Sequence, residues 1–429
     1  MREKFIKSTI ILIIGGFITK ILGMFIRIVM TRFVGVEGIG LYMLVMPTYG
    51  LFITICTLSL PVAISKLVSE NTRNNKNVVL GIIPIALLFN VFVVGILILL
   101  ARFISDDLLR NDFLYYPIVA CSVTLPFITV SSIIRGYFFG KERMVPHVVS
   151  NLFEQVVRLG LIFFIMPFLM RSGIVSAVCG LILFNVVSEF CSILILFLFI
   201  PKNVRICKRD ILPDCHNVRD IFSISIPTTA GRIINSVSGF LEPVIITGVL
   251  LALGYSNSYI TYEYGLVTGF VFPMVMLPQF LSGAISSALL PTISRYNEMG
   301  ENGFIKRRLF QAILVSLGIG GVFTFVFMVF PRECLDVMFS SWDGYRYLVF
   351  ASPIFLISYV QGPIVSALQA MDKAGVVMKS SLIGAVFKVL VLYVCLYFDI
   401  GMYALLISIG FQYVLVTIYQ YFKLRKFLA

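Results

Sequence analysis

The sequence contains about twelve apolar segments, each long enough to cross a lipid bilayer as a helix. A bilayer with a hydrocarbon core of about 30 Å requires roughly 20 apolar residues per helical crossing. The composition agrees, since 59% of the 429 residues are hydrophobic, 13% are charged and the mean hydropathy is +0.99. We therefore expect an all-α integral protein of the plasma membrane. Its spans lie near residues 8–31, 40–65, 78–101, 113–138, 146–170, 173–200, 221–252, 264–294, 308–331, 345–370, 375–398 and 400–422.

The basic residues between these segments predict the orientation of the chain. If the N-terminus is cytoplasmic, 22 of the 34 Lys and Arg residues fall in cytoplasmic segments and six in outer loops. Cytoplasmic loops of membrane proteins carry such an excess of Lys and Arg. Both termini are therefore predicted to be cytoplasmic, and the number of spans is predicted to be even.

The most polar stretch between spans, residues 201–220, divides the chain into two halves. We predict a six-helix lobe in residues 1–200, a cytoplasmic linker in 201–220 and a second six-helix lobe in 221–429. Six helices per half give both copies the same orientation, as expected for parallel repeats. The second helix of each half repeats a pattern of glycine, prolines and a terminal cation: Gly40, Pro47, Pro61 and Lys66 in one half, and Gly265, Pro273, Pro291 and Arg295 in the other.

The first span carries two cations where lipid would surround a helix. Gly16, Lys20, Gly23 and Arg27 fall on one helical face, at steps of four, three and four residues. A cation near the bilayer centre costs roughly 2.5–3.5 kcal/mol on insertion scales, so such residues usually have a function. The glycines allow a partner or ligand to approach closely. We predict that this face lines a polar cavity that receives an anionic group.

Further charges lie within the other spans. The intramembrane cations outnumber the anions by six to three, which favours an anionic cargo: Lys20, Arg27, Arg135, Arg158, Arg232 and Lys388 against Glu154, Glu189 and Glu242.

Each of the remaining charges also has a structural interpretation. Glu154 and Arg158, four residues apart on one helix, either neutralise each other or contribute to the cavity. Arg135 is expected to reach the cytoplasmic interface. Arg232 is predicted to bind cargo, with Glu242 as a partner in space, and the role of Lys388 stays open.

Several function classes lack support in the sequence. No phosphate-binding loop, nucleophile elbow or paired-carboxylate pattern is present, so we expect no enzyme and no cofactor. Cys207, Cys215 and His216 do not match the spacing of a zinc site. The net charge of +13 is explained by cytoplasmic loops, and no nucleic-acid module accompanies it.

Long motifs give the chain a resemblance to a known family. They run through Gly35–Tyr42, Pro47–Phe52 and Pro61–Glu70 in the first half, and recur around Arg135–Gly140, Glu154–Arg158, Ile226–Arg232, Leu277–Pro278 and Pro291–Ser294. This pattern resembles the stage V sporulation protein B group. That group belongs to the polysaccharide exporters of the multidrug/oligosaccharidyl-lipid/polysaccharide superfamily, which includes the lipid II flippases.

The resemblance implies a two-lobed flippase that moves an undecaprenyl-pyrophosphate-linked saccharide from the inner to the outer leaflet. By position, contact with the pyrophosphate falls on Lys20 and Arg27, with Arg232 from the second half. Lipid II or another envelope or spore-cortex precursor is the expected cargo, and the coupling ion, H⁺ or Na⁺, is left open. Many members end in two further helices that hold the lipid tail, and these have no counterpart among the twelve expected spans.

Two alternative functions stay open at this stage. A cation-coupled multidrug exporter of the same fold would be expected to carry a carboxylate in its first helix, and none lies between Ile10 and Arg32. A non-transporting membrane scaffold would have little use for intramembrane cations.

Overall fold

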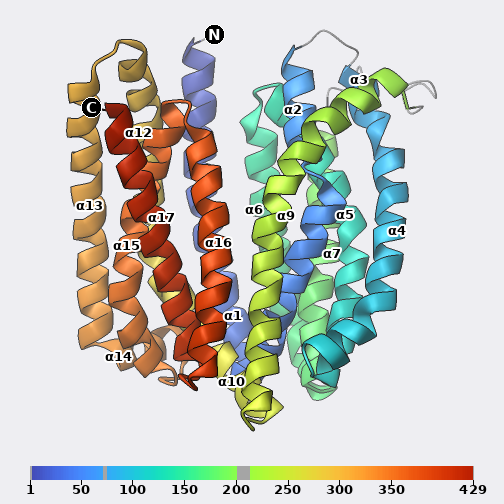
Figure 1. The fold of residues 1–429 in the computed structure, drawn as a ribbon. Helices are drawn as coiled ribbons and strands as arrows, with labels where there is room; N and C mark the ends of the chain where they lie inside the picture. Colours follow the sequence, from blue (N-terminus) through green and yellow to red (C-terminus); the bar gives the residue numbers. More distant parts are fainter. Residues whose placement is uncertain (1, 71–74, 201–212, 429) are drawn as a thin grey trace. The chain divides into compact units, whose positions relative to one another are not determined.

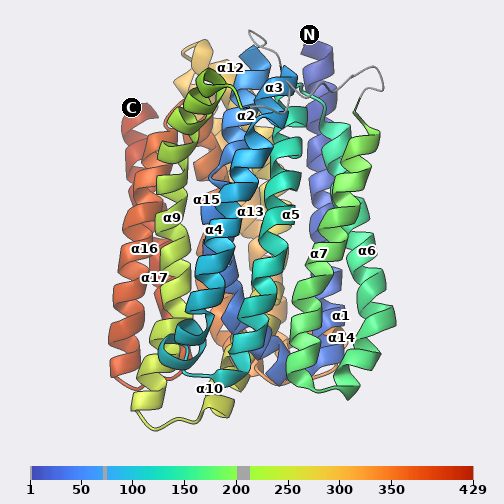
Figure 2. The same ribbon diagram turned by 90° about the vertical axis from the view of Figure 1, so that its right-hand side faces the viewer.

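The computed structural model describes residues 2–70, 75–200 and 213–428, and these residues form helices and no strands. Figure 1 shows their order, and in Figure 2 the long helices of each unit again run side by side. The helices are α1 (Arg2–Thr57), α2 (Leu60–Glu70), α3 (Asn75–Leu80), α4 (Ile82–Arg102), η1 (Phe103–Leu108), η2 (Asp112–Leu114), α5 (Tyr115–Gly140), α6 (Met144–Arg171), α7 (Ile174–Leu198), α9 (Cys215–Ala252), α10 (Asn257–Gly265), η3 (Leu266–Val271), α11 (Phe272–Val275), α12 (Leu277–Glu298), α13 (Asn302–Val329), α14 (Pro331–Phe339), α15 (Tyr345–Ala370), α16 (Ala374–Tyr397) and α17 (Tyr403–Leu428).

The number of spans agrees with a multi-pass membrane protein. In the described residues, ten helices are long and apolar enough to cross a membrane, and the bent pair Asn257–Val275 and Leu277–Glu298 gives an eleventh. The first of the ten covers 57 residues, or about 85 Å, nearly three times the hydrocarbon thickness. It is broken at Gly35, whose φ of 70° and ψ of −176° suit a residue without a Cβ. If the segments before and after Gly35 are counted as two separate crossings, the described residues contain the expected twelve spans.

The chain forms two compact units, Met1–Phe240 and Leu241–Ala429. Their boundary lies inside α9, so residues 215–240, the larger part of that helix, belong with α1–α7. The predicted linker, 201–220, lies largely outside the described residues, and the predicted lobe boundaries stay predictions.

The N-terminal unit is held together by close contacts between α2 and α5. A Cβ added at Gly136 would lie 2.8 Å from the Pro61 Cα, and one at Gly140 would lie 2.6 Å from the Ser65 carbonyl oxygen. Only glycine allows two backbones to approach so closely. Around this contact, buried side chains of α2, α3, α4, α5 and α9 form one apolar cluster: Leu60, Ala63, Ile64, Leu67, Val68, Val78, Ile82, Ala86, Ile133 and Ile221.

The C-terminal unit contains a second broken span. Helices α10, η3 and α11 run into α12 with a bend of 42° at Met276. At the far end of α12, buried side chains join α12, α13, α15 and α17 in one cluster, against which the start of α16 packs. Its members are Leu289, Ile293, Ile305, Leu309, Ala312, Ile364, Ala367, Leu368, Ala370, Met371, Leu424 and Leu428.

Candidate functional site

Of two adjacent faces of α1, one is packed against α6 and the other has open space beside its glycines. Gly15 is buried, and a Cβ there would lie 2.2 Å from Val148 of α6. On the predicted basic face, a Cβ at Gly16 or Gly23 would meet no atom within 4 Å. Lys20 on that face is exposed and Arg27 is half-buried. Beside its two glycines, the face that carries the two cations therefore has open space among the described residues.

Arg232 lies at a polar seam between α9 and the end of α1. Its Nη1 donates to the Ser59 hydroxyl at 3.4 Å, and one turn further along α9 the Ser236 hydroxyl lies 2.8 Å from that of Thr54. Ser59 adopts a left-handed conformation with φ of 48°, which ends α1 before α2 begins. The Arg232 side chain is otherwise exposed.

Arg158 and Glu154 belong to a buried ion network across α5, α6 and α7, helices that lie side by side in Figure 2. The Glu154 carboxylate accepts from Arg158 at 2.8 Å through one oxygen and from Arg135 at 2.9 Å through the other. Arg135 also reaches Glu189 at 3.3 Å. Both carboxylate residues are only 7% exposed. Two guanidinium groups thus balance two carboxylates within the membrane-spanning part.

This network bears on two of the structural interpretations. The side chains of Glu154 and Arg158 form the ion pair that one interpretation expects, and their contribution to a binding cavity stays a prediction. The expectation that Arg135 reaches the interface is wrong, because its guanidinium donates to Glu154, Glu189 and the Ser192 hydroxyl. Two carboxylates in a low-dielectric interior hold the cation there more strongly than the interface attracts it.

Glu242 is engaged within the C-terminal unit. Its carboxylate is hydrogen-bonded to the Lys388 ammonium of α16, and the Tyr264 hydroxyl donates to it at 3.3 Å. Glu242 is 8% exposed and Tyr264 is 2% exposed. The expected pairing of Glu242 with Arg232 is therefore corrected: its partner among the described residues is Lys388. Lys388, whose role was open, supplies the charge that compensates a buried carboxylate.

These contacts divide the intramembrane charges into two groups. All three intramembrane carboxylates are occupied, Glu154 and Glu189 by arginines and Glu242 by Lys388. Among the described residues, neither Arg27 nor Arg232 forms an ion pair with a carboxylate. Within the described residues, these two arginines of the spans are therefore not neutralised by a carboxylate.

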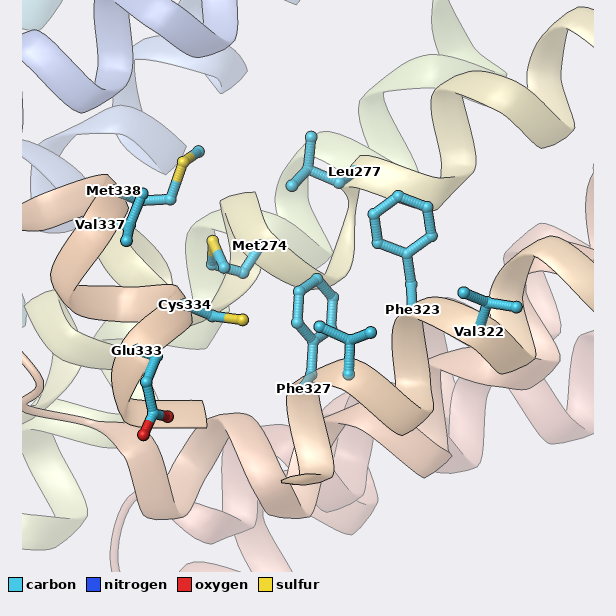
Figure 3. Close-up of a pocket in the computed structure, with 10 residues that line it drawn as sticks. Met274, Leu277, Val322, Phe323, Phe327, Glu333, Cys334, Val337 and Met338 are labelled. Carbon is cyan, nitrogen blue, oxygen red and sulfur yellow. The ribbon is translucent and has the colours of Figure 1, made fainter. Parts of the chain in front are cut away.

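The structure also contains an apolar cavity, which Figure 3 shows in the C-terminal unit. It has a volume of about 470 Å³, and hydrophobic side chains of α11, α12, α13 and α14 line it, among them Met274, Leu277 and Phe327. The Glu333 carboxylate at its edge points away from these three side chains in Figure 3. None of the six predicted binding residues lines it. Such a cavity offers no group that would bind a phosphate.

Sequence reasoning did not identify several of these contacts. Glu189 lies 54 residues from Arg135 in the chain, and Ser59 lies 173 residues from Arg232. The sequence does show that Glu189 is a lone carboxylate inside an apolar span. A carboxylate in that position requires a partner. No group of three or more potential metal-binding side chains occurs in the described residues, so the structure offers no metal centre there.

With this geometry established, comparison with known proteins identifies the family. The profile of the polysaccharide biosynthesis protein family matches residues 5–297. Stage V sporulation protein B of Bacillus subtilis is 35% identical over 398 residues, which cover 90% of this chain and 77% of that protein. The chain belongs to the polysaccharide biosynthesis protein family. The resemblance of the sequence to the stage V sporulation protein B group is thereby confirmed.

More distant relatives resemble the chain in sequence or in fold. Lipid II flippase MurJ of Bacillus subtilis is 23% identical over 431 residues, covering 90% of this chain and 76% of that protein. Among solved structures, an inward-facing multidrug resistance MATE transporter has a TM-score of 0.73 at 14% identity, over 96% of this chain and 94% of the other. The inward closed lipid II flippase MurJ has a TM-score of 0.70 at 13% identity, over 97% of this chain and 87% of that one. The two solved structures establish the fold, which is all-helical and MATE-like as predicted.

Proposed function

We propose that this protein is a flippase that carries an undecaprenyl-pyrophosphate-linked saccharide, such as lipid II or a polysaccharide precursor, from the inner to the outer leaflet. The observation that carries the proposal is the charge balance inside the spans. Every intramembrane carboxylate is matched, whereas Arg27 and Arg232 have no carboxylate partner among the described residues. A pyrophosphate is an anion that would satisfy such cations.

In this proposal, Lys20, Arg27 and Arg232 meet the pyrophosphate while the polyprenyl tail stays in the lipid. A guanidinium presents paired N–H donors that fit phosphate oxygens, and the attraction is stronger in a low-dielectric cavity than in water. Binding has to stay weak enough for release on the other side. Arg27 and Arg232, which form no ion pair with a described carboxylate, suit such transient binding better than a tight cage would. The open face of α1 gives the head group access to Lys20 and Arg27.

The paired charges have a different part in the proposal. We assign Glu154, Arg158 and Glu242 to holding helices together, because their partners are protein side chains. Alternating access then moves the two lobes as packed bodies, and the ion pairs keep each body intact during that motion. Transport of a cargo, rather than chemical conversion, is the activity we assign.

The test uses cells depleted of their own lipid II flippase and supplied with this protein. We expect lipid II to become accessible to an externally added enzyme that cleaves it, and we expect Arg27→Ala to abolish that rescue. Arg102→Ala is the matched control, because the Arg102 side chain is 84% exposed at the end of α4. Rescue that persists in membrane-inserted Arg27→Ala would contradict the assignment of the binding residues. Export of a cationic dye without any lipid II exposure would instead favour the drug exporter.

A further inference from the structure

One end of the C-terminal unit carries tyrosines that are hydrogen-bonded to carboxylates. It is built from α10 with the turn before it, from the turn between α14 and α15 with the start of α15, and from the turn between α16 and α17. Figure 1 shows α10 and α14 at the end opposite the C-terminus. Each tyrosine hydroxyl donates to one carboxylate at 2.5–3.0 Å: Tyr255 to Asp399, Tyr262 to Asp343 and Tyr347 to Glu263. We call these six residues the tyrosine–carboxylate rim.

The three hydrogen bonds fix the rim as one surface. Two of them join α10 to the start of α15 and the turn before it, and the third joins the turn before α10 to the turn between α16 and α17. The rings of Tyr347 and Tyr403 add a contact between α15 and α17, with centroids 4.7 Å apart. A surface that is already held in place loses little conformational entropy when it binds a ligand, so the rim is preorganised.

Two exposed aromatic rings lie beside the rim. Tyr259 is 43% exposed and stacks on Tyr255, with ring centroids 5.2 Å apart and an interplanar angle of 19°. Trp342, the one tryptophan of the sequence, is 54% exposed and precedes Asp343. The Arg332 guanidinium lies over the Trp342 ring at 5.0 Å. Because each ring has a stacking partner, each presents a flat apolar face in a fixed orientation.

The carboxylates of the rim can accept further hydrogen bonds. A carboxylate has about four acceptor positions, and its tyrosine uses one of them. Asp343 also accepts from the Ser341 hydroxyl at 3.0 Å. The side chains of Asp343 and Asp399 are exposed, and that of Glu263 is half-buried. Hydrogen-bond acceptors and flat apolar faces therefore lie side by side on one accessible surface.

Anchoring in the lipid interface accounts for this surface less well than a ligand does. Aromatic residues of an interface keep the ring in the apolar region and turn the polar group toward water and lipid head groups. In the rim, the three hydroxyls donate to carboxylates of the protein instead. Carboxylates also repel the phosphates of anionic lipids. The rim therefore suits an uncharged ligand that is rich in hydroxyl groups.

We propose that the rim, with the exposed faces of Tyr259 and Trp342, binds the sugar rings of the cargo after the head group has crossed the membrane. This inference rests on the proposed function, which supplies a saccharide as cargo. A pyranose ring has an apolar face of C–H groups that packs on an aromatic ring, and its hydroxyls donate to carboxylates. The predicted orientation places this end outside, because the C-terminus is predicted to be cytoplasmic. A sugar bound there holds the head group at the outer side while the pyrophosphate leaves its cations.

The test measures binding of soluble saccharides to the purified full-length protein through its tryptophan fluorescence, which comes from Trp342 alone. The probes are trimers of N-acetylglucosamine and of glucose, which carry neither a lipid nor a pyrophosphate. We expect a saturable change of the emission with at least one trimer. Asp343→Asn/Asp399→Asn should lower the affinity by at least about tenfold, because it removes two charged acceptors. Both side chains are exposed, so the variant should fold, and its thermal unfolding is measured alongside.

The matched control is Glu333→Gln/Asp336→Gln, which removes two exposed carboxylates from α14 in the same unit and leaves the rim intact. It should change the affinity by less than about twofold, because distant carboxylates do not attract an uncharged sugar.

An emission that responds to neither trimer would overturn the proposal, and a response to lipid nanodiscs alone would assign the rim to membrane anchoring. An equal loss in both double variants would also overturn it, because general acidity would then explain the effect. Soluble trimers require no transport. Failure of saccharide binding and failure of lipid II exposure are therefore separate results, and the second alone would count against the proposed function.

Discussion

Two regions of the N-terminal unit carry charges within the membrane in opposite ways. On α5, α6 and α7, two carboxylates meet two guanidinium groups at 2.8–3.3 Å, and the set is neutral. On α1, Arg27 lies on a face where a Cβ at Gly23 would contact nothing within 4 Å. The comparison shows that a charge in a membrane span is not by itself a binding residue. A satisfied charge joins helices, and a charge without an internal counter-ion is available to a ligand.

The largest loss of stability is expected on breaking the ion network. Arg135→Ala leaves Glu189 without its cation and should lower the free energy of unfolding by about 3–5 kcal/mol. Thermal unfolding of the purified variant measures this. The double variant Arg135→Met/Glu189→Gln removes both charges and should recover much of the loss. A single variant as stable as the wild type would contradict a structural role for the network.

A smaller effect is expected in the C-terminal unit, where a single ion pair takes the place of the network. Glu242→Gln should cost about 1.5–3 kcal/mol, because Lys388 loses a charged partner but its flexible stem can carry the ammonium toward a polar region. The double variant Glu242→Gln/Lys388→Met should lose less free energy of unfolding than the two single variants lose in sum. Strictly additive losses would mean that the two side chains are not coupled.

The packing that positions the network can be tested separately. Gly136 follows Arg135 on α5, and an added Cβ would lie 2.8 Å from the Pro61 Cα, so Gly136→Ala should destabilise the protein by about 1–3 kcal/mol. Gly160→Ala on α6 is the control, because a Cβ there meets nothing within 4 Å and alanine favours a helix by up to about 1 kcal/mol. An equal loss of stability in Gly136→Ala and Gly160→Ala would contradict the importance of the close contact at Gly136.

The smallest effect is expected for a charge pair outside the interior. Arg102 and Asp106 form a pair at 3.3 Å at the end of α4, with side chains 84% and 35% exposed. Arg102→Ala should change the free energy of unfolding by no more than about 0.5 kcal/mol. A loss comparable to that of Arg135→Ala would show that burial is not what separates the two kinds of charge.

Much of the fold could be predicted from the sequence, because helices in lipid must satisfy their backbone internally and so appear as long apolar segments. The basic face of α1 was also predictable, since helical spacing alone places Lys20 and Arg27 together. Pairs between distant segments could not be predicted. Arg135 and Glu189 are joined where α5 packs against α7, and Glu242 and Lys388 form an ion pair between α9 and α16. Nothing in the local sequence records which helices become neighbours.

The most direct test of the account compares binding of undecaprenyl pyrophosphate to the purified wild type and to Arg27→Ala/Arg232→Ala. Two charge-assisted hydrogen bonds of about 1.5–3 kcal/mol each predict an affinity at least about 100-fold lower for the double variant. Its thermal unfolding should stay close to that of the wild type, because neither arginine pairs with a described carboxylate. Unchanged affinity in the folded double variant would contradict the claim that these arginines receive the pyrophosphate.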